Sequence, residues 1–258
     1  MKIAILIPTY SFYSGPDRLV HRQAQDFLKS GHDVLIVTLG GDITPPKGAK
    51  LVKLGMPKNP TLQRIYRFLM FMDARTISKA AALVKGSDKI ICHMYPMTLI
   101  ARRAQKKYKI HYNYYNMGVA YPRLFRSFFE RTAMKIFLKL TIWTVKGADS
   151  ATSISEFLRQ ELLDETGVDG NVEHCKIDKR FKKGLSGDSI KKKYGLKGPV
   201  CLYVGRISPH KGIYLLIKSF KIIKEKYPTA ALIIAGKPTF DSSFNELKRL
   251  ANRDKSII

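Results

Sequence analysis

The sequence has few acidic residues for its size. It contains 20 Asp and Glu against 46 Lys and Arg, which gives a formal net charge of +26 over 258 residues. A surplus of this size must lie largely on the surface, where it attracts phosphate groups, polyanions and anionic lipid. The composition therefore predicts negatively charged partners.

Cysteine is also scarce. Cys92, Cys175 and Cys201 lie far apart and form no Cys-x-x-Cys pair, which excludes a disulfide framework and favours reduced thiols in a cytoplasmic protein. Cys92 and Cys175 each have a histidine neighbour, but adjacent residues of a strand point to opposite faces, and the spacing fits no common zinc pattern. We therefore expect no disulfide and no metal site.

Long hydrophobic runs are absent as well. The apolar run in MKIAILIPTYS is too short for a secretion signal and is interrupted by Pro8. No stretch of about 18 apolar residues is free of charge, which argues against a membrane-spanning helix. We expect a cytoplasmic protein whose membrane contact, if it has one, is peripheral and at the inner face.

Short apolar segments alternate with amphipathic helical patterns along the chain. The first strand is expected at residues 2–7, followed by a helix over 17–30 that Gly31 stops, and a strand at 33–38. Further strands are expected at 50–54, 89–93, 109–115 and 149–154. This alternation predicts an α/β fold with a doubly wound parallel sheet.

The pattern lapses into a basic, glycine-bearing stretch at 179–198. We therefore expect a Rossmann-like N-terminal domain over 1–178, and over 179–258 a linker and the first part of a second one. The second series gives strands at 199–204 and 231–236 and helices at 210–226 and 242–252. Two strands and two helices are too few to bury both faces of a sheet, so the second Rossmann-like domain is expected to be incomplete.

The turn between residues 204 and 213 carries two cations. The strand runs into Gly205-Arg206, and Lys211-Gly212 precedes the helix. Such a turn lies at the carboxyl edge of a parallel sheet, where open α/β folds bind ligands, and the helix start presents free N–H groups. Ser208 and Pro209 suit the N-cap and first turn. Arg206 and Lys211 suit a diphosphate, although spacing alone equally allows two solvated surface residues.

This stretch resembles the Gly-Arg-x4-Lys-Gly signature that opens the C-terminal domain of family 4 glycosyltransferases, which have the GT-B fold. Four other segments agree with that family in order: SGPDRLVHRQAQDFLKSGHDVLIVT (14–38), DKIICHMYPMTLIA (88–101), ADSATSISEFLRQEL (148–162) and VEHCKIDKRF (172–181). The resemblance implies two Rossmann-like domains and a retaining transfer of a sugar from a nucleotide-diphosphate sugar to an acceptor.

The resemblance also implies roles for single residues. Arg206 and Lys211 would stabilise the charge that develops on the leaving phosphate, and His93 would hydrogen bond to the donor sugar across an interdomain cleft. Gly15, Gly205 and Gly212 would let the nucleotide or the acceptor approach the backbone. A metal or other cofactor is not expected. Without the resemblance, a satisfied polar residue at a strand end is the preferred interpretation of His93, and a plain turn glycine is an equal alternative for Gly15.

The first loop has one glycine, Gly15, where the family often has two, and the acidic Glu-x7-Glu motif of the family's C-terminal domain is not found between residues 179 and 258, where the glutamates are Glu225 and Glu246. We therefore keep a second hypothesis, a truncated and catalytically inactive fragment that acts only in membrane or partner binding. For Ser155 and Glu156, which match a Ser-Glu pair of the family, helix capping is the preferred interpretation.

Two segments combine aromatic and basic residues, 64–71 and the helical pattern over 122–146. The second places an apolar face opposite Arg131, Lys135 and Lys139; that face can pack in the core or lie on an anionic bilayer. We therefore expect peripheral membrane contact and a lipid-linked or glycan acceptor. Specific nucleic-acid binding is not expected, because no recognition motif accompanies the charge.

Overall fold

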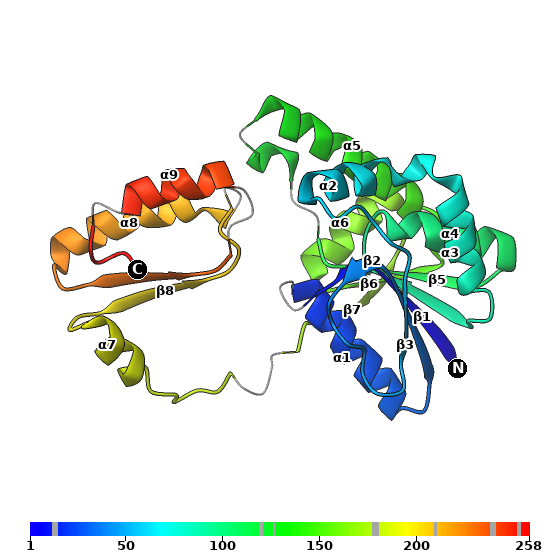
Figure 1. The fold of residues 1–258 in the computed structure, drawn as a ribbon, viewed down its shortest axis with the longest axis horizontal. Helices are drawn as coiled ribbons and strands as arrows, with labels where there is room; N and C mark the ends of the chain where they lie inside the picture. The colour runs from blue at the N-terminus through cyan, green and yellow to red at the C-terminus, as the bar shows by residue number, and fades with distance from the viewer. Residues whose placement is uncertain are drawn as a thin grey trace. The chain divides into compact units, whose positions relative to one another are not determined.

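The computed structural model describes residues 1–11, 15–118, 121–125, 127–176, 181–208, 211–237, 241–251 and 254–258. The chain divides into two compact units (Figure 1). Unit 1 comprises Met1–Val119 and Ala133–Lys176, and unit 2 comprises Ala120–Thr132 and Ile177–Ile258. The main division thus lies two residues from the boundary expected after residue 178, and the short segment 120–132 goes with the second unit.

Unit 1 is built on a seven-stranded parallel sheet with the strand order β3-β2-β1-β4-β5-β6-β7. Its strands are β1 (Lys2–Tyr10), β2 (Asp33–Gly41), β3 (Lys50–Lys53), β4 (Lys89–Cys92), β5 (His111–Asn116), β6 (Ser150–Ser153) and β7 (Gly170–Val172). In the central register Ile5 lies opposite Ile36 on one side and Ile91 on the other. The order reverses beside β1, which confirms the doubly wound arrangement expected from the alternating pattern.

Alternation along β1 builds a core on each face of this sheet. Ile3, Ile5 and Ile7 pack with α1, whereas Ala4 and Leu6 pack in a larger core with helices of the other face. The helices are α1 (Gly15–Lys29), α2 (Pro60–Leu69), η1 (Met70–Met72), α3 (Ala74–Leu83), α4 (Met97–Tyr108) and α6 (Glu156–Thr166). Both faces of the central strands are therefore buried, as a near-continuous apolar strand requires.

The helix expected over 122–146 is shorter than predicted. Pro122 opens a 3₁₀ turn, η2 (Pro122–Leu124), and Phe125 is extended, so α5 spans Phe128–Val145. Its apolar face is also divided: Phe137 and Leu140 pack against the larger core, whereas Phe129, Ile136 and Trp143 are exposed. Core packing thus uses only part of the apolar face that the sequence predicted.

Unit 2 contains a parallel pair, β8 (Val200–Val204) and β9 (Ala231–Ala235), to which Ile257 adds one further parallel bridge at Leu232. The remaining helices are α7 (Asp188–Tyr194), α8 (Ile213–Lys226) and α9 (Asp241–Ala251). Its small core includes Ile213, Ile217 and Phe220 of α8 together with Leu232. Leu202 and Val204 are exposed, so within the described residues only one face of this sheet is covered.

No helix among the described residues combines the length and the apolar character that crossing a bilayer demands.

The larger core of unit 1 makes a testable prediction at Leu6, which is fully buried in β1. We expect Leu6→Ala to lower the free energy of unfolding of unit 1 by about 2–5 kcal/mol, because the substitution leaves a cavity that the rigid sheet cannot close. Urea unfolding followed by circular dichroism measures the loss. The control is Leu83→Ala, at an exposed position of α3, and an equal loss in both variants would contradict this account of the core.

Candidate functional site

The turn between β8 and α8 carries the two cations that the sequence singled out. Arg206 follows β8 and Lys211 precedes α8, and both side chains are exposed. No hydrogen bond or ion pair of either side chain is found among the described residues. Both side chains are therefore accessible to an anion from solvent.

The start of α8 differs from the prediction. Ser208 was expected as the N-cap and Pro209 in the first turn, but α8 begins at Ile213 and its N-cap is Gly212; Pro209 lies outside the described residues. Ser208 is fully buried, and its carbonyl accepts a hydrogen bond from Lys211 N at 3.0 Å. Gly212 has φ +70°, which a glycine adopts without steric cost. The helix therefore starts one turn later, with Lys211 directly before it.

Two glycines bring the ends of β8 and β9 close together. A Cβ on Gly236 would lie 1.8 Å from the carbonyl oxygen of Gly205, so only glycine fits there. The backbone ladder continues beyond the strands, with Gly205 N donating to Ala235 O at 3.0 Å and Ile207 N donating to Lys237 O at 2.9 Å. The sequence analysis noticed Gly205 but missed Gly236, although the run ALIIAG ends on it.

Tyr203 fixes the course of the turn. Its hydroxyl donates a hydrogen bond to the carbonyl of Arg206 at 2.9 Å. The Arg206 charge lowers the pKa of this phenol, but partial burial outweighs that effect and raises it overall. The hydroxyl thus stays protonated and can donate. A strand tyrosine gives no sequence signal for such a contact, because the partner is a backbone carbonyl three residues ahead.

Unit 1 has its own candidate site at the point where the strand order reverses. β1 and β4 are neighbours in the sheet, and the chain leaves their carboxyl ends toward α1 on one face and α4 on the other. Ligands of open α/β sheets bind in the crevice at such a switch point. Ser11 follows β1, α1 begins at Gly15, and His93 follows β4, so the described parts of two predicted site segments lie at the same edge of the sheet.

His93 is held rigidly and is completely buried. Its backbone N–H donates to Leu6 O at 3.0 Å, and its ring lies 4.9 Å from the ring of Tyr115, at 34° to it. Neither ring nitrogen has a hydrogen-bond partner within the described part of the chain. Burial lowers the pKa of His93 to about 3, so the imidazole is neutral at physiological pH.

Other polar groups share this buried region. The Oε1 atom of Gln23 and the hydroxyl of Tyr115 also lack a well-placed hydrogen-bond partner among the described residues, although the Gln23 amide lies near enough to lower the pKa of the Tyr115 phenol. Burial raises that pKa by more, and Glu173 raises it further. The sequence analysis missed Gln23 and Tyr115, because on their own elements they look like ordinary helix and strand residues.

The first loop is anchored by Asp17, an acidic residue two positions after Gly15. Asp17 is buried, and its Oδ2 accepts hydrogen bonds from Ser11 N at 2.6 Å and Ser11 Oγ at 3.0 Å. Gly15 is the first residue of α1, and a Cβ there would meet nothing within 4 Å. The fold itself therefore does not require glycine at position 15. Residues 12–14 lie outside the described part.

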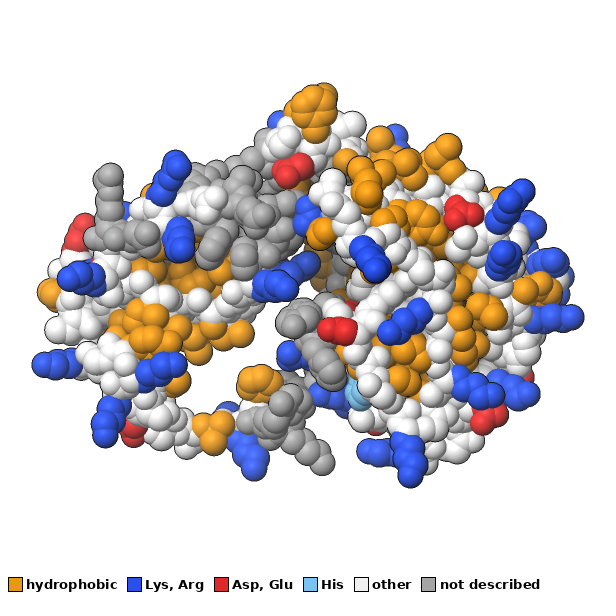
Figure 2. Space-filling view, in the orientation of Figure 1, with side chains coloured by type: hydrophobic (Ala, Val, Ile, Leu, Met, Phe, Trp, Pro, Cys, Tyr) orange, Lys and Arg blue, Asp and Glu red, His pale blue; other side chains and the backbone are white. Residues whose placement is uncertain are grey.

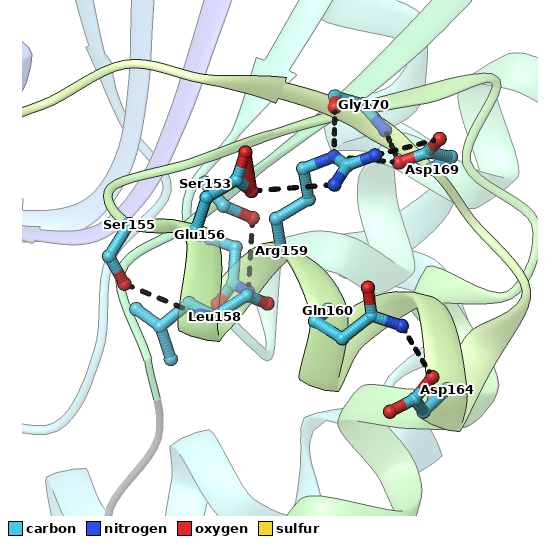
Figure 3. Close-up of polar contacts among 10 residues, drawn as sticks. Ser153, Ser155, Glu156, Leu158, Arg159, Gln160, Asp164, Asp169 and Gly170 are labelled. Atoms are coloured by element: carbon cyan, nitrogen blue, oxygen red, sulfur yellow. Dashed lines mark hydrogen bonds and ion pairs between the residues drawn. The ribbon is translucent and has the colours of Figure 1, made fainter.

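Ser155 and Glu156 act as the capping interpretation predicts (Figure 3). Ser155 Oγ accepts a hydrogen bond from Leu158 N at 3.3 Å, and Glu156 lies 3.4 Å from Arg159 NH1 in the first turn of α6. Arg159 also pairs with Asp169, with 3.0 Å between Nε and Oδ1. These contacts join the start of α6 to β7, and they account for both residues without a ligand.

Metal ligation finds no support in the described residues, where no three His, Cys, Asp or Glu side chains gather closely enough to hold an ion. Cys92, Cys175 and Cys201 are free thiols, and burial raises the pKa of Cys92 far above its ordinary value. The chemistry that the two sites offer is therefore anion binding by Arg206 and Lys211 and hydrogen bonding by a neutral imidazole.

Comparisons of the sequence point to glycosyltransferases. A 107-residue segment is 34% identical to YtcC of Bacillus subtilis (strain 168), assigned as a glycosyltransferase, over 37% of this chain and 26% of the relative. A 128-residue segment is 30% identical to the uncharacterized glycosyltransferase MJ1059 of Methanocaldococcus jannaschii, over 48% of this chain and 30% of the relative. These matches therefore span less than a third of the curated relatives.

Solved structures show the same fold. HepE of Anabaena, solved in complex with UDP-glucose, superposes with a TM-score of 0.73 at 14% identity over 100% of this chain and 68% of HepE. WaaG, a glycosyltransferase involved in lipopolysaccharide biosynthesis, gives 0.69 at 14% identity over 99% of this chain and 69% of WaaG. The fold class expected from the sequence, GT-B, is confirmed.

Family profiles cover most of the chain in the order that the two units predict. The profile described as "Glycosyl transferases group 1" matches residues 187–258, and the one described as "Glycosyltransferase Family 4" matches residues 13–175. The chain belongs to glycosyltransferase family 4.

Proposed function

We propose that the protein transfers a sugar, with retention of anomeric configuration, from a nucleotide-diphosphate sugar to an acceptor hydroxyl. In this reaction the bond from the anomeric carbon to the diphosphate oxygen breaks, a bond to the acceptor oxygen forms, and the acceptor loses its proton. The observation that carries the proposal is the pair of exposed cations, Arg206 and Lys211, at the carboxyl edge of the β8–β9 sheet.

The two cations suit the leaving group. Negative charge grows on the diphosphate as the sugar departs, and preorganised positive groups at that position lower the barrier. Arg206 offers a planar fork to two oxygens, and Lys211 offers a point charge directly before α8. Gly212 and Gly205 keep the backbone around them free of bulk. UDP-glucose, the ligand of the HepE structure, is the first donor to test.

His93 fits a role on the sugar. A neutral imidazole both donates and accepts a hydrogen bond, and both ring nitrogens of His93 are without a partner in the described residues. Its position at the switch point of the sheet places it where α/β folds bind ligands. We propose that one ring nitrogen binds a hydroxyl of the donor sugar, which replaces the hydration that burial removes.

The acceptor is proposed to be lipid-linked or a membrane glycan. WaaG acts in lipopolysaccharide biosynthesis, and the net charge of +26 favours the surface of an anionic membrane. We therefore propose that the protein works in peripheral contact with such a membrane. The reaction is also proposed to need no metal, because two side chains and a helix start already supply positive charge to the diphosphate.

Donor binding gives the first test of this function. A matching nucleotide-diphosphate sugar is expected to raise the melting temperature of the protein, and Arg206→Ala or Lys211→Ala to weaken its affinity by roughly 10- to 100-fold, because each removes a charge-assisted contact to phosphate worth about 1.5–3 kcal/mol. Thermal shift against a panel of donors, followed by calorimetry, measures both effects.

The matched control for donor binding is Lys218→Ala, an exposed lysine of α8 outside the turn. It changes net charge as Lys211→Ala does and is expected to leave affinity within about twofold, since exposed charges farther than a Debye length of about 10 Å are screened. A donor that stabilises all variants equally would remove the phosphate role from Arg206 and Lys211.

The buried His93 makes stability depend on pH. Its folded pKa of about 3 lies below the value of about 6.5 in an unfolded chain, so below pH 6.5 the unfolded state binds more protons. This contribution to stability is complete above about pH 6.5 and is lost as the pH falls toward 3. His93→Phe is expected to reduce the slope of unfolding free energy between pH 6.5 and 5 by up to about 1.4 kcal/mol per pH unit.

Urea unfolding of both proteins at several pH values measures that slope. His21, whose pKa partial burial also lowers, contributes in the same direction and stays in both proteins. An unchanged slope in the His93→Phe variant would mean that the imidazole is not held neutral.

Chelation tests the proposal on metals. We expect sugar transfer and donor binding to be unchanged when EDTA is present in about 10-fold molar excess over any contaminating divalent ion. The reason is that the positive charge at the diphosphate comes from side chains. A loss of donor affinity that added Mg²⁺ or Mn²⁺ restores would show that a metal shares that task.

A further inference from the structure

The segment after β3 presents apolar side chains to solvent. Leu62, Ile65 and Leu69 are 52%, 48% and 40% exposed, and Phe71 and Met72 of η1 are 42% and 71% exposed. We name these five residues the α2 surface. Leu62, Ile65 and Leu69 follow an i, i+3, i+7 spacing and so share one face of α2, and no residue of α2 is buried.

The fold holds α2 in place without using this face. Asn59 Oδ1 caps the helix by accepting from Thr61 N at 2.9 Å and Leu62 N at 3.2 Å. From beneath, Tyr95 OH donates to Phe68 O at 2.8 Å, and Tyr66 packs on the larger core. The helix is therefore anchored through residues other than those of the α2 surface, and an exposed apolar cluster of this kind marks a contact site.

The segment that carries the α2 surface has an excess of positive charge. Between residues 53 and 75 the chain has five basic residues, Lys53, Lys58, Arg64, Arg67 and Arg75, and one acidic residue, Asp73. Asp73 caps α3 by accepting from Thr76 N at 3.0 Å, which lowers its pKa, so the carboxylate is engaged in its own backbone. Hydrophobic and basic side chains lie over this part of unit 1 in Figure 2.

An anionic lipid surface fits this combination better than a protein does. A short amphipathic helix with leucine and phenylalanine on one side and arginine and lysine on the other lies in the plane of a membrane interface. Protein interfaces are depleted in lysine but are enriched in arginine, methionine and aromatic residues, so the feature that favours lipid here is the excess of positive charge. Each basic residue near anionic lipid also strengthens the attraction.

We propose that the α2 surface inserts into the headgroup region of an anionic bilayer, with α2 and η1 lying along the membrane. This proposal rests on the membrane contact proposed above and names the surface that makes it. It does not depend on sugar transfer, because the predicted contact requires no nucleotide.

Vesicle co-sedimentation tests it. At low salt the protein is expected to bind phosphatidylcholine vesicles that contain about one-third phosphatidylglycerol. It is expected to bind vesicles of pure phosphatidylcholine at least about tenfold more weakly. The double variant Leu62→Gln/Ile65→Gln is expected to lose at least about tenfold in partitioning into vesicles, since two exposed aliphatic side chains that would enter the bilayer are replaced by polar ones. The matched control is Leu83→Gln/Phe157→Gln, two apolar residues of unit 1 that are exposed on α3 and α6.

A spectroscopic readout locates the contact. Trp143 is the only tryptophan of the sequence, so Phe71→Trp in a Trp143→Phe background reports on η1 alone. Its emission is expected to shift to the blue on anionic vesicles, and that of Phe157→Trp in the same background is expected not to shift.

The outcomes separate the two levels of the proposal. If the native protein ignores anionic vesicles at low salt, both the membrane contact and the α2 surface as its site are wrong, and the surface would then suit a protein partner. If the native protein binds but the α2 double variant binds as the control does, only the assignment of this surface is wrong. Either failure leaves the donor-binding tests unaffected.

Discussion

The parallel register between β1 and β4 is the constraint on which the site of unit 1 depends. Because β1 and β4 are neighbours and the chain leaves them toward opposite faces, Ser11 after β1 and His93 after β4 lie at the same edge of the sheet, where open α/β folds bind ligands. The backbone bond from His93 to Leu6 extends that register by one residue and thereby fixes the imidazole. A buried polar ring whose nitrogens have no hydrogen-bond partner in the described part of the chain is energetically costly, so the strand pair must hold the imidazole there against that cost.

The candidate anion site of unit 2 is built differently. There the close approach of Gly205 and Gly236 brings the ends of two strands together, and Tyr203 holds the following carbonyl. The hydrogen bonds that hold the backbone of the turn therefore come from other backbone groups and from the Tyr203 hydroxyl. Within the described residues, the side chains of Arg206 and Lys211 take no part in them. In unit 1, by contrast, the charged residue at the corresponding loop is Asp17, and its carboxylate accepts a hydrogen bond from Ser11 of the same loop. The two sites therefore differ in what they leave free: positive charge in unit 2 and a neutral hydrogen-bonding ring in unit 1.

Hydrophobic periodicity predicted β1–β6, β8 and β9, and the helices α1, α8 and α9, to within about three residues, because burial on the two faces of a sheet imposes it directly. It did not predict the short strand β7 and gave no bounds for α2, α3, α4, α6 or α7. It failed where local geometry decided. Ser208 has the residue type of an N-cap, yet α8 starts after Gly212, since a glycine at positive φ redirects the chain before the helix. The sequence predicted one continuous apolar face for α5, yet Phe137, Leu140 and Val145 pack in the larger core while Phe129, Ile136 and Trp143 are exposed. Gln23 and Tyr115 were missed because contacts between distant elements leave no mark on either segment.

The charge surplus does not by itself select a partner, because charges act over short distances. At physiological salt the Debye length is about 8 Å, so most of the 46 basic residues do not reinforce one another at a given site. What would select an anion is the local arrangement. We propose that Arg206 and Lys211, exposed at a sheet edge, select a diphosphate, and that basic residues near exposed aliphatic chains select a lipid headgroup. A free polyanion can pair with the cations of either arrangement, but it does not match the uncharged groups beside them. The same charge surplus can therefore contribute to the two proposed contacts, with a small donor and with a membrane, through separate surfaces. In each contact the uncharged atoms beside the cations would distinguish the intended partner from other anions.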